Sequence, residues 1–238
     1  MQVTIFRDEQ TEDAYRCILQ EHRFKTVFIR LFSSETINLN SLLSGQCGYS
    51  ALICTSQKSC ESLKLAIDNH AIHSSWLKAV VYCVGPATAK SLRALGFGTL
   101  GESCGSSKAL GDFIDTNHNK NDGGLLFLCG DKAPSFPGKC NAYTTTIQSY
   151  ITVPLEFKFD PSSTQFCVFF SPSGVELVFS QVEPAMFTDV CCIAIGPSTF
   201  ETLDKHRIIK KIMADEPTPT GVFRAILIHC DLLKAIPC

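Results

Sequence analysis

Two five-residue stretches, Val84-Gly85-Pro86-Ala87-Thr88 and Ile195-Gly196-Pro197-Ser198-Thr199, are near copies of each other, with every position of the second numbered 111 higher. Ser91-Leu92 and Thr202-Leu203 continue the match at the same offset. Each copy follows an apolar run and places proline directly after glycine, where proline suits the first position of a helix. A repeat in the same local setting indicates two copies of one α/β unit, and therefore two lobes of similar fold.

Short apolar runs alternate with helical patterns along the chain, which is typical of a parallel α/β sheet. After residues 166–170, for example, Val175, Val178, Phe179 and Val182 recur at the spacing of one helix face. The runs expected to form buried strands are residues 3–6, 27–31, 51–54, 80–84, 125–129, 166–170 and 191–195.

Two further stretches look extended, residues 28–37 before the first repeat unit and residues 149–157 between the two units. If both cross between lobes, the N-terminal strand and helix complete the lobe formed by the C-terminal half. The residues alone leave that arrangement open.

Composition narrows the function classes. The chain has 238 residues, 45% of them hydrophobic and 18% charged, which is typical of a soluble globular protein. Its apolar runs are far shorter than the ~20 residues of a membrane-spanning helix, and residues 1–8 do not resemble a signal peptide. A net charge of −2 without a basic stripe argues against a nucleic-acid partner. We therefore expect a cytoplasmic protein.

Neither a metal nor a cofactor is indicated. Most of the 13 cysteines lie in apolar runs, so we expect reduced core thiols. His70 and His73 lack the further ligands of a zinc site. Residues 96–101 have the Gly-x-Gly-x-x-Gly pattern, but they close a helix and enter a short strand, whereas a dinucleotide fingerprint follows a strand and opens a helix.

Four loops follow expected strands and begin expected helices: Thr55-Ser56, residues 85–88, residues 171–174 and residues 196–199. Each presents free backbone N–H groups and a hydroxyl at one edge of a sheet, where α/β proteins bind ligands. Each loop alone is explained by helix capping. Four of them, two in each lobe, favour a cleft that receives an anionic ligand.

Several of these residues resemble the uroporphyrinogen-III synthase family. The specific segments are Phe169-Phe170-Ser171-Pro172-Ser173-Gly174 and Ala194-Ile195-Gly196-Pro197-Ser198-Thr199. Residues 81–89, 101–105 and 217–219 agree as well, so that the resemblance covers roughly residues 50–230.

The resemblance implies two flavodoxin-like α/β lobes with parallel sheets, joined by a two-stranded β-ladder, with a cleft between them. Residues 1–32 and 160–238 would form one discontinuous lobe, residues 40–146 the other, and residues 33–39 and 147–159 the linker. Members of the family convert the linear tetrapyrrole hydroxymethylbilane to uroporphyrinogen III, with loss of water and inversion of ring D, and need no cofactor.

The resemblance also implies residue roles. Tyr150 corresponds to the family tyrosine proposed to assist hydroxyl loss, and packing alone is the alternative for it. The positions that would bind substrate are Thr55, Ser56, Gly85, Thr88, Ser171, Ser173, Gly196 and Thr199. Where the family has Thr-Ser-Pro-Arg, this chain has Thr55-Ser56-Gln57-Lys58, so a guanidinium is replaced by an ammonium.

Two other functions remain open at this stage. One is a non-catalytic two-lobed protein that binds a small polycarboxylate. The other is a hydrolase or transferase with an activated, exposed cysteine. With no long apolar stripe for an obligate dimer, we expect a monomer that takes its substrate from hydroxymethylbilane synthase.

Overall fold

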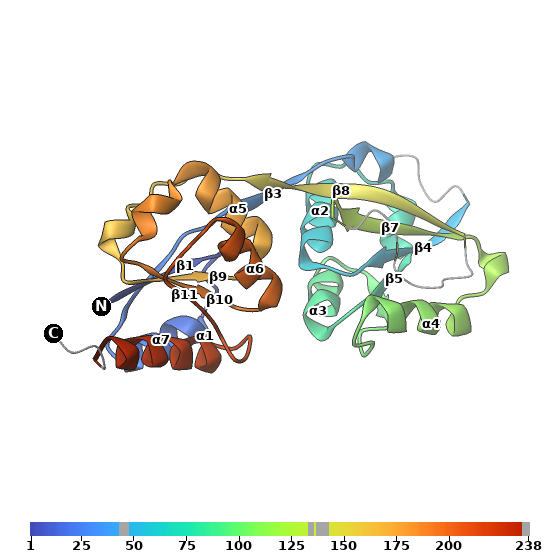
Figure 1. Ribbon diagram of the computed structural model, residues 1–238. Coiled ribbons are helices and arrows are strands. Elements are labelled where there is room, and N and C mark those ends of the chain that lie inside the picture. Colours follow the sequence, from blue (N-terminus) through green and yellow to red (C-terminus); the bar gives the residue numbers. More distant parts are fainter. Residues whose placement is uncertain (43–47, 133–135, 137–142, 235–238) are drawn as a thin grey trace. The chain divides into compact units, whose positions relative to one another are not determined.

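The computed structural model describes residues 1–42, 48–132, 136 and 143–234. The chain divides into two compact units (Figure 1). Unit 1 consists of Met1–Ser33 and Pro154–Cys238, and unit 2 consists of Ser34–Val153. The sequence-based division, with separate linker segments, stays a prediction.

Within the described residues, unit 1 contains a five-stranded sheet in the order β11-β10-β9-β1-β2, and neighbouring strands are parallel. The strands are β1 (Gln2–Phe6), β2 (Lys25–Phe28), β9 (Phe166–Phe169), β10 (Cys191–Ala194) and β11 (Lys211–Met213). Read from β2, this is the 2-1-3-4-5 order of one common type of doubly wound sheet.

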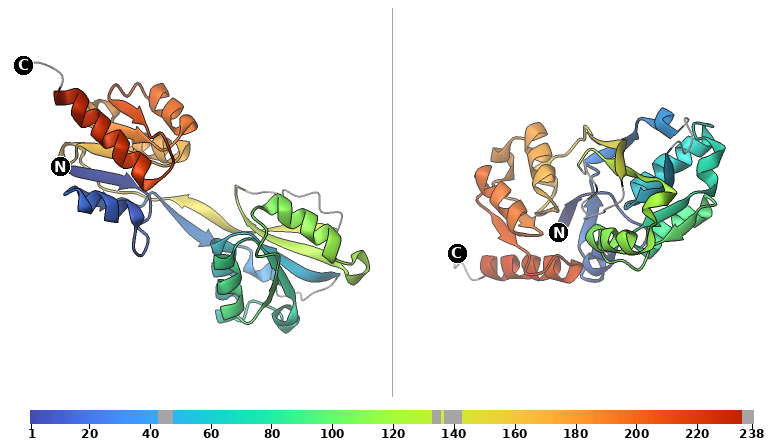
Figure 2. Two further views of the ribbon diagram at one scale, coloured as in Figure 1. Left: turned by 90° about the horizontal axis from the view of Figure 1, so that it is seen from below. Right: turned by 90° about the vertical axis from the view of Figure 1, so that its right-hand side faces the viewer.

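Helices cover both faces of the unit 1 sheet. Helices α1 (Ala14–Glu21) and α7 (Pro219–Lys234) lie together on one face, seen from below in Figure 2. Helices α5 (Pro172–Gln181) and α6 (Pro197–Lys205) cover the other. Residues of β10 alternate accordingly, because successive side chains of a strand point to opposite faces: Ile193 packs with α7 and Ala194 with α5 and α6.

Unit 2 is built around a six-stranded sheet in the order β3-β8-β7-β4-β5-β6, counted over the described part of the chain. Its strands are β3 (Phe32–Thr36), β4 (Tyr49–Cys54), β5 (Val80–Cys83), β6 (Gly98–Leu100), β7 (Gly124–Gly130) and β8 (Thr144–Pro154). Helices α2 (Gln57–Asp68) and α3 (Pro86–Ala94) cover one face, and α4 (Ser107–Asn117) covers the other.

The two units share one strand arrangement, but the chain enters it at different points. The series β4-α2-β5-α3-β6 in unit 2 matches β9-α5-β10-α6-β11 in unit 1. The two strands beside it are β7 and β8, which follow the series in unit 2, and β1 and β2, which precede it in unit 1. The α/β fold with mostly parallel sheets, predicted from the sequence, is therefore confirmed.

The expected strand over residues 27–31 is wrong in position. Strand β2 ends at Phe28 because its parallel partner β1 ends at Phe6. The last hydrogen bond between the two segments runs from Ile29 N to Ile5 O (2.9 Å). The expected extended stretch over residues 28–37 is interrupted: it holds the last residue of β2, a break at residues 29–31, and β3, and the two strands belong to different sheets. Short 3₁₀ helices complete the described chain: Leu39–Leu42, Ser74–Lys78, Lys120–Asp122, Pro161–Ser163 and Pro184–Phe187.

Candidate active site

Tyr150 of unit 2 owes its direction to a β-bulge. Strand β8 pairs with β7 so that Gln148 lies opposite Cys129 and Tyr150 opposite Gly130, which leaves Ser149 as an extra residue. In a regular strand, residues 147 and 150 would point to opposite faces of the sheet. The bulge reverses the alternation, so Ile147 and Tyr150 both face α2.

The phenol of Tyr150 reaches the first turn of α2. Its Oη lies 3.3 Å from Oγ of Ser56, the N-cap residue of that helix. The Ser56 hydroxyl also accepts a hydrogen bond from Ser59 N (3.2 Å). Lys58 Nζ lies 5.8 Å from the centre of the Tyr150 ring, within range of a cation–π contact. Tyr150 is half-buried, so part of its surface remains accessible.

Gly130 makes this position of the phenol possible. A Cβ at residue 130 would lie 2.8 Å from Tyr150 Oη and closer still to ring carbons Cε2 and Cζ. The ring therefore rests on the backbone where β7 ends. Gly130 also lines a cavity of about 220 Å³ together with Cys129, Asp131, Thr146 and Gln148, and Tyr150 is not one of the lining residues.

The remaining predicted residues of unit 2 lie at the same edge of the sheet. Cys54 and Cys83 are in register at the ends of β4 and β5, so the loops with Thr55 and Gly85 begin side by side. Gln57 links the two helices that follow, because its Nε2 donates to Thr88 Oγ1 (3.4 Å). Among the predicted residues, the structure thus joins Ser56 directly to Tyr150 and brings Thr88 near them through Gln57.

Gly85 is the N-cap of α3 with φ +82°, a left-handed conformation that favours glycine. Its repeat counterpart, Gly196, caps α6 with φ −168°, which is ordinary extended backbone. The two copies of the repeat therefore use glycine for different reasons.

Unit 1 holds the other four predicted residues. Ser171 is the N-cap of α5, accepts from Gly174 N (3.1 Å) and lies 3.1 Å from Ser173 Oγ. Phe169 and Ala194 are in register, so the loops that begin α5 and α6 start at one edge. Gly196 and the buried Thr199 belong to the second of these loops.

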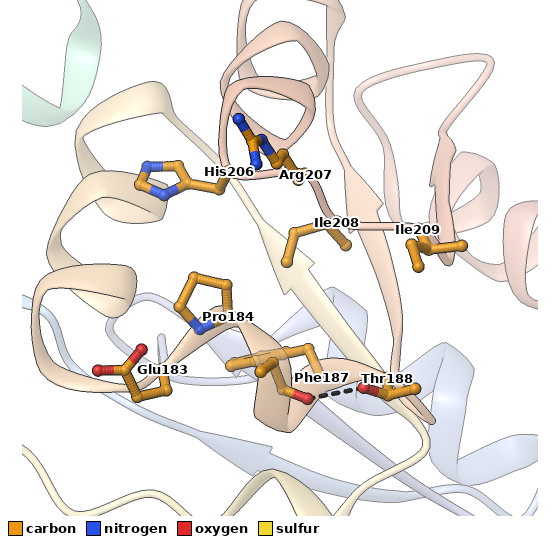
Figure 3. A pocket seen from close by; sticks show the side chains of 9 residues that line it. Glu183, Pro184, Phe187, Thr188, His206, Arg207, Ile208 and Ile209 are labelled. Carbon is orange, nitrogen blue, oxygen red and sulfur yellow. Dashed lines mark hydrogen bonds between the residues drawn. The ribbon is translucent and has the colours of Figure 1, made fainter.

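Unit 1 also has a cavity of about 380 Å³ at the opposite edge, where β10 and β11 begin (Figure 3). It contains none of the predicted site residues. Its lining residues are Glu183, Pro184, Ala185, Phe187, Thr188, His206, Arg207, Ile208 and Ile209.

The cysteine beside the site is not an activated nucleophile. Burial raises the pKa of the Cys60 thiol to about 11, although Cys60 Sγ lies 3.5 Å from Ser56 O. Burial likewise raises the pKa of Cys83 to about 11. All ten cysteines in the described ranges are free thiols. A hydrolase that uses one of these two thiols at neutral pH is therefore not supported.

The described residues contain no group of three or more His, Cys, Asp or Glu side chains placed to hold a metal ion. Over the same residues, no helix is both long and apolar enough to cross a lipid bilayer.

The Gly-x-Gly-x-x-Gly pattern of residues 96–101 closes a helix, as expected. Gly96, with φ +93°, follows α3, and Gly98 begins β6, whereas a dinucleotide fingerprint follows a strand and opens a helix.

Sequence reasoning missed Gly130 and Gln57 as parts of this site. Gly130 follows an apolar run, but nothing in the sequence indicates that an aromatic ring 20 positions later rests on it. Gln57 appeared only as a departure from a family motif, whereas the structure shows it bonded to both Thr88 and Ser91 Oγ (2.8 Å).

Comparison with known proteins identifies the family. A family model described as uroporphyrinogen-III synthase HemD matches residues 13–224. Uroporphyrinogen-III synthase of Saccharomyces cerevisiae is 25% identical over 91% of this chain and 92% of its own length. The Schizosaccharomyces pombe protein of the same name is 28% identical over 75% of each chain.

Solved structures agree with the fold. The crystal structure of uroporphyrinogen-III synthetase from Helicobacter pylori is similar over 96% of this chain and 100% of that one, with a TM-score of 0.61 and 14% identity. The resemblance seen in the sequence is confirmed by the family model, which spans most of the chain: the protein belongs to the uroporphyrinogen-III synthase family.

Proposed function

We propose that this protein closes hydroxymethylbilane to uroporphyrinogen III, with loss of water and inversion of ring D. Family membership supports the reaction. The observation that carries the proposal is the placement of the Tyr150 phenol at the N-terminus of α2, 3.3 Å from Ser56 Oγ and at the loop edge of the unit 2 sheet.

In the proposed mechanism, Tyr150 assists departure of the substrate hydroxyl. A phenolic hydroxyl can donate to the leaving oxygen, and the pyrrole nitrogen stabilises the azafulvene cation that remains. Attack from ring D then gives a spiro intermediate, which fragments and recloses with ring D inverted. The protein mainly needs to fold the substrate so that the correct carbon attacks.

The substrate carries eight carboxylates, and we propose that the helix-capping loops bind them. In unit 2 these are the loops with Thr55, Ser56, Gly85 and Thr88. In unit 1 they are the loops with Ser171, Ser173, Gly196 and Thr199. Free N–H groups at helix starts bind anions without a basic surface, which suits a net charge of −2.

The finer architecture belongs to the same proposal. Residues 1–32 with 160–238 and residues 40–146 would be flavodoxin-like lobes, and residues 33–39 and 147–159 their two-stranded linker. We further propose that the protein acts as a cytoplasmic monomer without a cofactor and receives its substrate from hydroxymethylbilane synthase.

The test is to incubate the protein with hydroxymethylbilane and to measure the ratio of type III to type I uroporphyrinogen. Spontaneous closure gives type I, so the proposal predicts an excess of type III that grows with enzyme concentration. Type I alone, together with binding of the substrate, would indicate a non-catalytic polycarboxylate-binding protein instead.

A further inference from the structure

Four groups in unit 2 form a chain of hydrogen bonds whose direction is fixed at one end. Ser59 Oγ lies 2.8 Å from Leu128 O, and a carbonyl oxygen only accepts, so the single Ser59 hydroxyl hydrogen points there. Ser59 is fully buried. Because the Ser59 hydroxyl hydrogen is already used in this bond, it determines which of the other two hydroxyls donates and which accepts.

Ser56 Oγ lies 3.1 Å from Ser59 Oγ. Because Ser59 has no hydrogen left to give, Ser56 is the donor of this bond. Ser56 then has none left for Tyr150, so the Tyr150 hydroxyl donates across the 3.3 Å contact to Ser56 Oγ. This count of donors assigns the phenol hydrogen to the side of Ser56.

That last bond is long for an O–H···O hydrogen bond, which is commonly 2.5–3.0 Å. Turning the phenol hydrogen away from Ser56 and toward a substrate hydroxyl therefore costs little hydrogen-bond energy. When Tyr150 has given up its proton, however, its oxygen becomes a strong acceptor, and the Ser56 hydroxyl can turn from Ser59 to donate to it.

We propose that Ser56 is a second catalytic residue, whose hydroxyl stabilises the Tyr150 phenolate as the substrate hydroxyl leaves, with Ser59 as the positioning residue that sets its resting direction. The inference rests on the proposed function. The phenol proton moves to the leaving oxygen, the C–O bond breaks with its electron pair on that oxygen, and water departs. An azafulvene cation and a phenolate remain, and a proton lost from the final ring carbon restores the phenol.

Two neighbours favour the same charged state. Lys58 places its ammonium 5.8 Å from the Tyr150 ring centre. The N-terminus of α2, a helix of 12 residues, directs its positive dipole end toward Ser56 and the phenol beyond it. Both features stabilise a negative charge on the Tyr150 oxygen.

The experiment is a double-mutant cycle on kcat and KM, with hydroxymethylbilane as substrate and Ser56→Ala, Tyr150→Phe and the double variant. A hydrogen bond to a charged group predicts that Ser56→Ala lowers kcat about 10- to 100-fold. KM should change little. Because Ser56 acts through Tyr150, the double variant should be no slower than Tyr150→Phe alone.

Three further variants distinguish the effect of the Ser56 hydroxyl on the reaction from its effect as the N-cap of α2. Ser56→Gly lacks the hydroxyl but caps a helix nearly as well as serine, so it should lose as much kcat as Ser56→Ala. Ser56→Thr restores the hydroxyl and should recover most of the loss. Ser106→Ala removes the N-cap of α4, where Ser106 Oγ accepts from Ala109 N (3.1 Å), and should have wild-type kcat.

Losses that multiply in the double variant, or a raised KM with wild-type kcat in Ser56→Ala and Ser56→Gly, would overturn the inference and leave Ser56 as a carboxylate-binding residue. In either case the wild-type protein would still form type III product. A wild-type protein that forms none would overturn the proposed function itself, and this inference with it.

Discussion

Tyr150 Oη and Ser56 Oγ lie 3.3 Å apart, although 94 residues separate them in the sequence. Two local features make the contact. The bulge at Ser149 turns Tyr150 toward α2, and the N-cap position of Ser56 holds its hydroxyl at the start of that helix. The phenol is thereby placed at the start of α2, and the acid role of Tyr150 stays a prediction.

Gly130→Ala should disturb the site without removing any of its polar groups. The new Cβ would fall 2.8 Å from Tyr150 Oη, too close for the phenol to remain where it is. We expect kcat to fall toward that of Tyr150→Phe while the thermal midpoint changes by only a few degrees, because the phenol end of the ring can move. Steady-state kinetics measures the fall in kcat, and thermal unfolding measures the change in the midpoint.

Gly98→Ala is the matched control for that variant, because a Cβ at this strand residue of unit 2 meets no atom within 4 Å. Wild-type kcat in Gly130→Ala would mean that the position of the phenol does not matter for the reaction.

Gly196→Asp should lower the activity of the protein more than it lowers its stability. Its φ of −168° suits any residue, and a Cβ there meets no atom within 4 Å, so the side chain can be accommodated. A carboxylate at a loop proposed to bind carboxylates repels the substrate, so KM should rise by an order of magnitude or more.

Gly196→Ala, measured beside it, should keep both the activity and the thermal midpoint of the wild type. If Gly196→Asp instead lost stability in proportion to activity, the position would serve folding rather than substrate binding.

Much of this fold can be predicted from the sequence, because the signals that determine it are local. The β5–α3 and β10–α6 segments coincide at the 111-residue offset of the repeat, since apolar runs and Gly-Pro starts mark both. The face with Val175 and Val178 is buried as expected. The free cysteines in the described strands also follow from their apolar surroundings.

The site could be predicted only in part, because its geometry comes from pairing between distant strands. Nothing near Ser149 in the sequence indicates that β8 slips by one residue against β7, yet that slip decides which way Tyr150 points. The different conformations of Gly85 and Gly196 are equally hidden, since both precede proline in near-identical motifs. The predicted binding roles of the eight loop residues stay predictions.

Stability should decline in alkaline solution. Burial raises the pKa of Cys60 and of Cys83 to about 11, whereas a thiol in an unfolded chain titrates near ~8.5. The folded state thus favours the protonated thiols. Their contribution is complete below the unfolded pKa and is lost as the pH rises from there toward 11. Denaturant titrations at pH 7.5, 9 and 10 should show the decline.

Cys60→Ala tests whether the buried Cys60 thiol contributes to this alkaline loss of stability. It should reduce the alkaline loss of unfolding free energy by on the order of 1–2 kcal/mol relative to wild type. Cys17→Ser, at an exposed position, is the control and should follow the wild-type profile. An identical pH dependence in Cys60→Ala and wild type would show that the buried thiol does not contribute.

The most direct test of the account is the turnover and product of Tyr150→Phe, assayed with hydroxymethylbilane beside the wild-type protein. General acid assistance is typically worth ~10²–10⁴ in rate, so kcat should fall within that range. KM should stay nearly unchanged and the product should remain type III, because the loops and not the phenol fold the substrate. Wild-type turnover would assign the proton donor to another group, and a switch to type I product would mean that Tyr150 positions ring D. Either result would contradict the role of Tyr150 as the acid that assists hydroxyl loss.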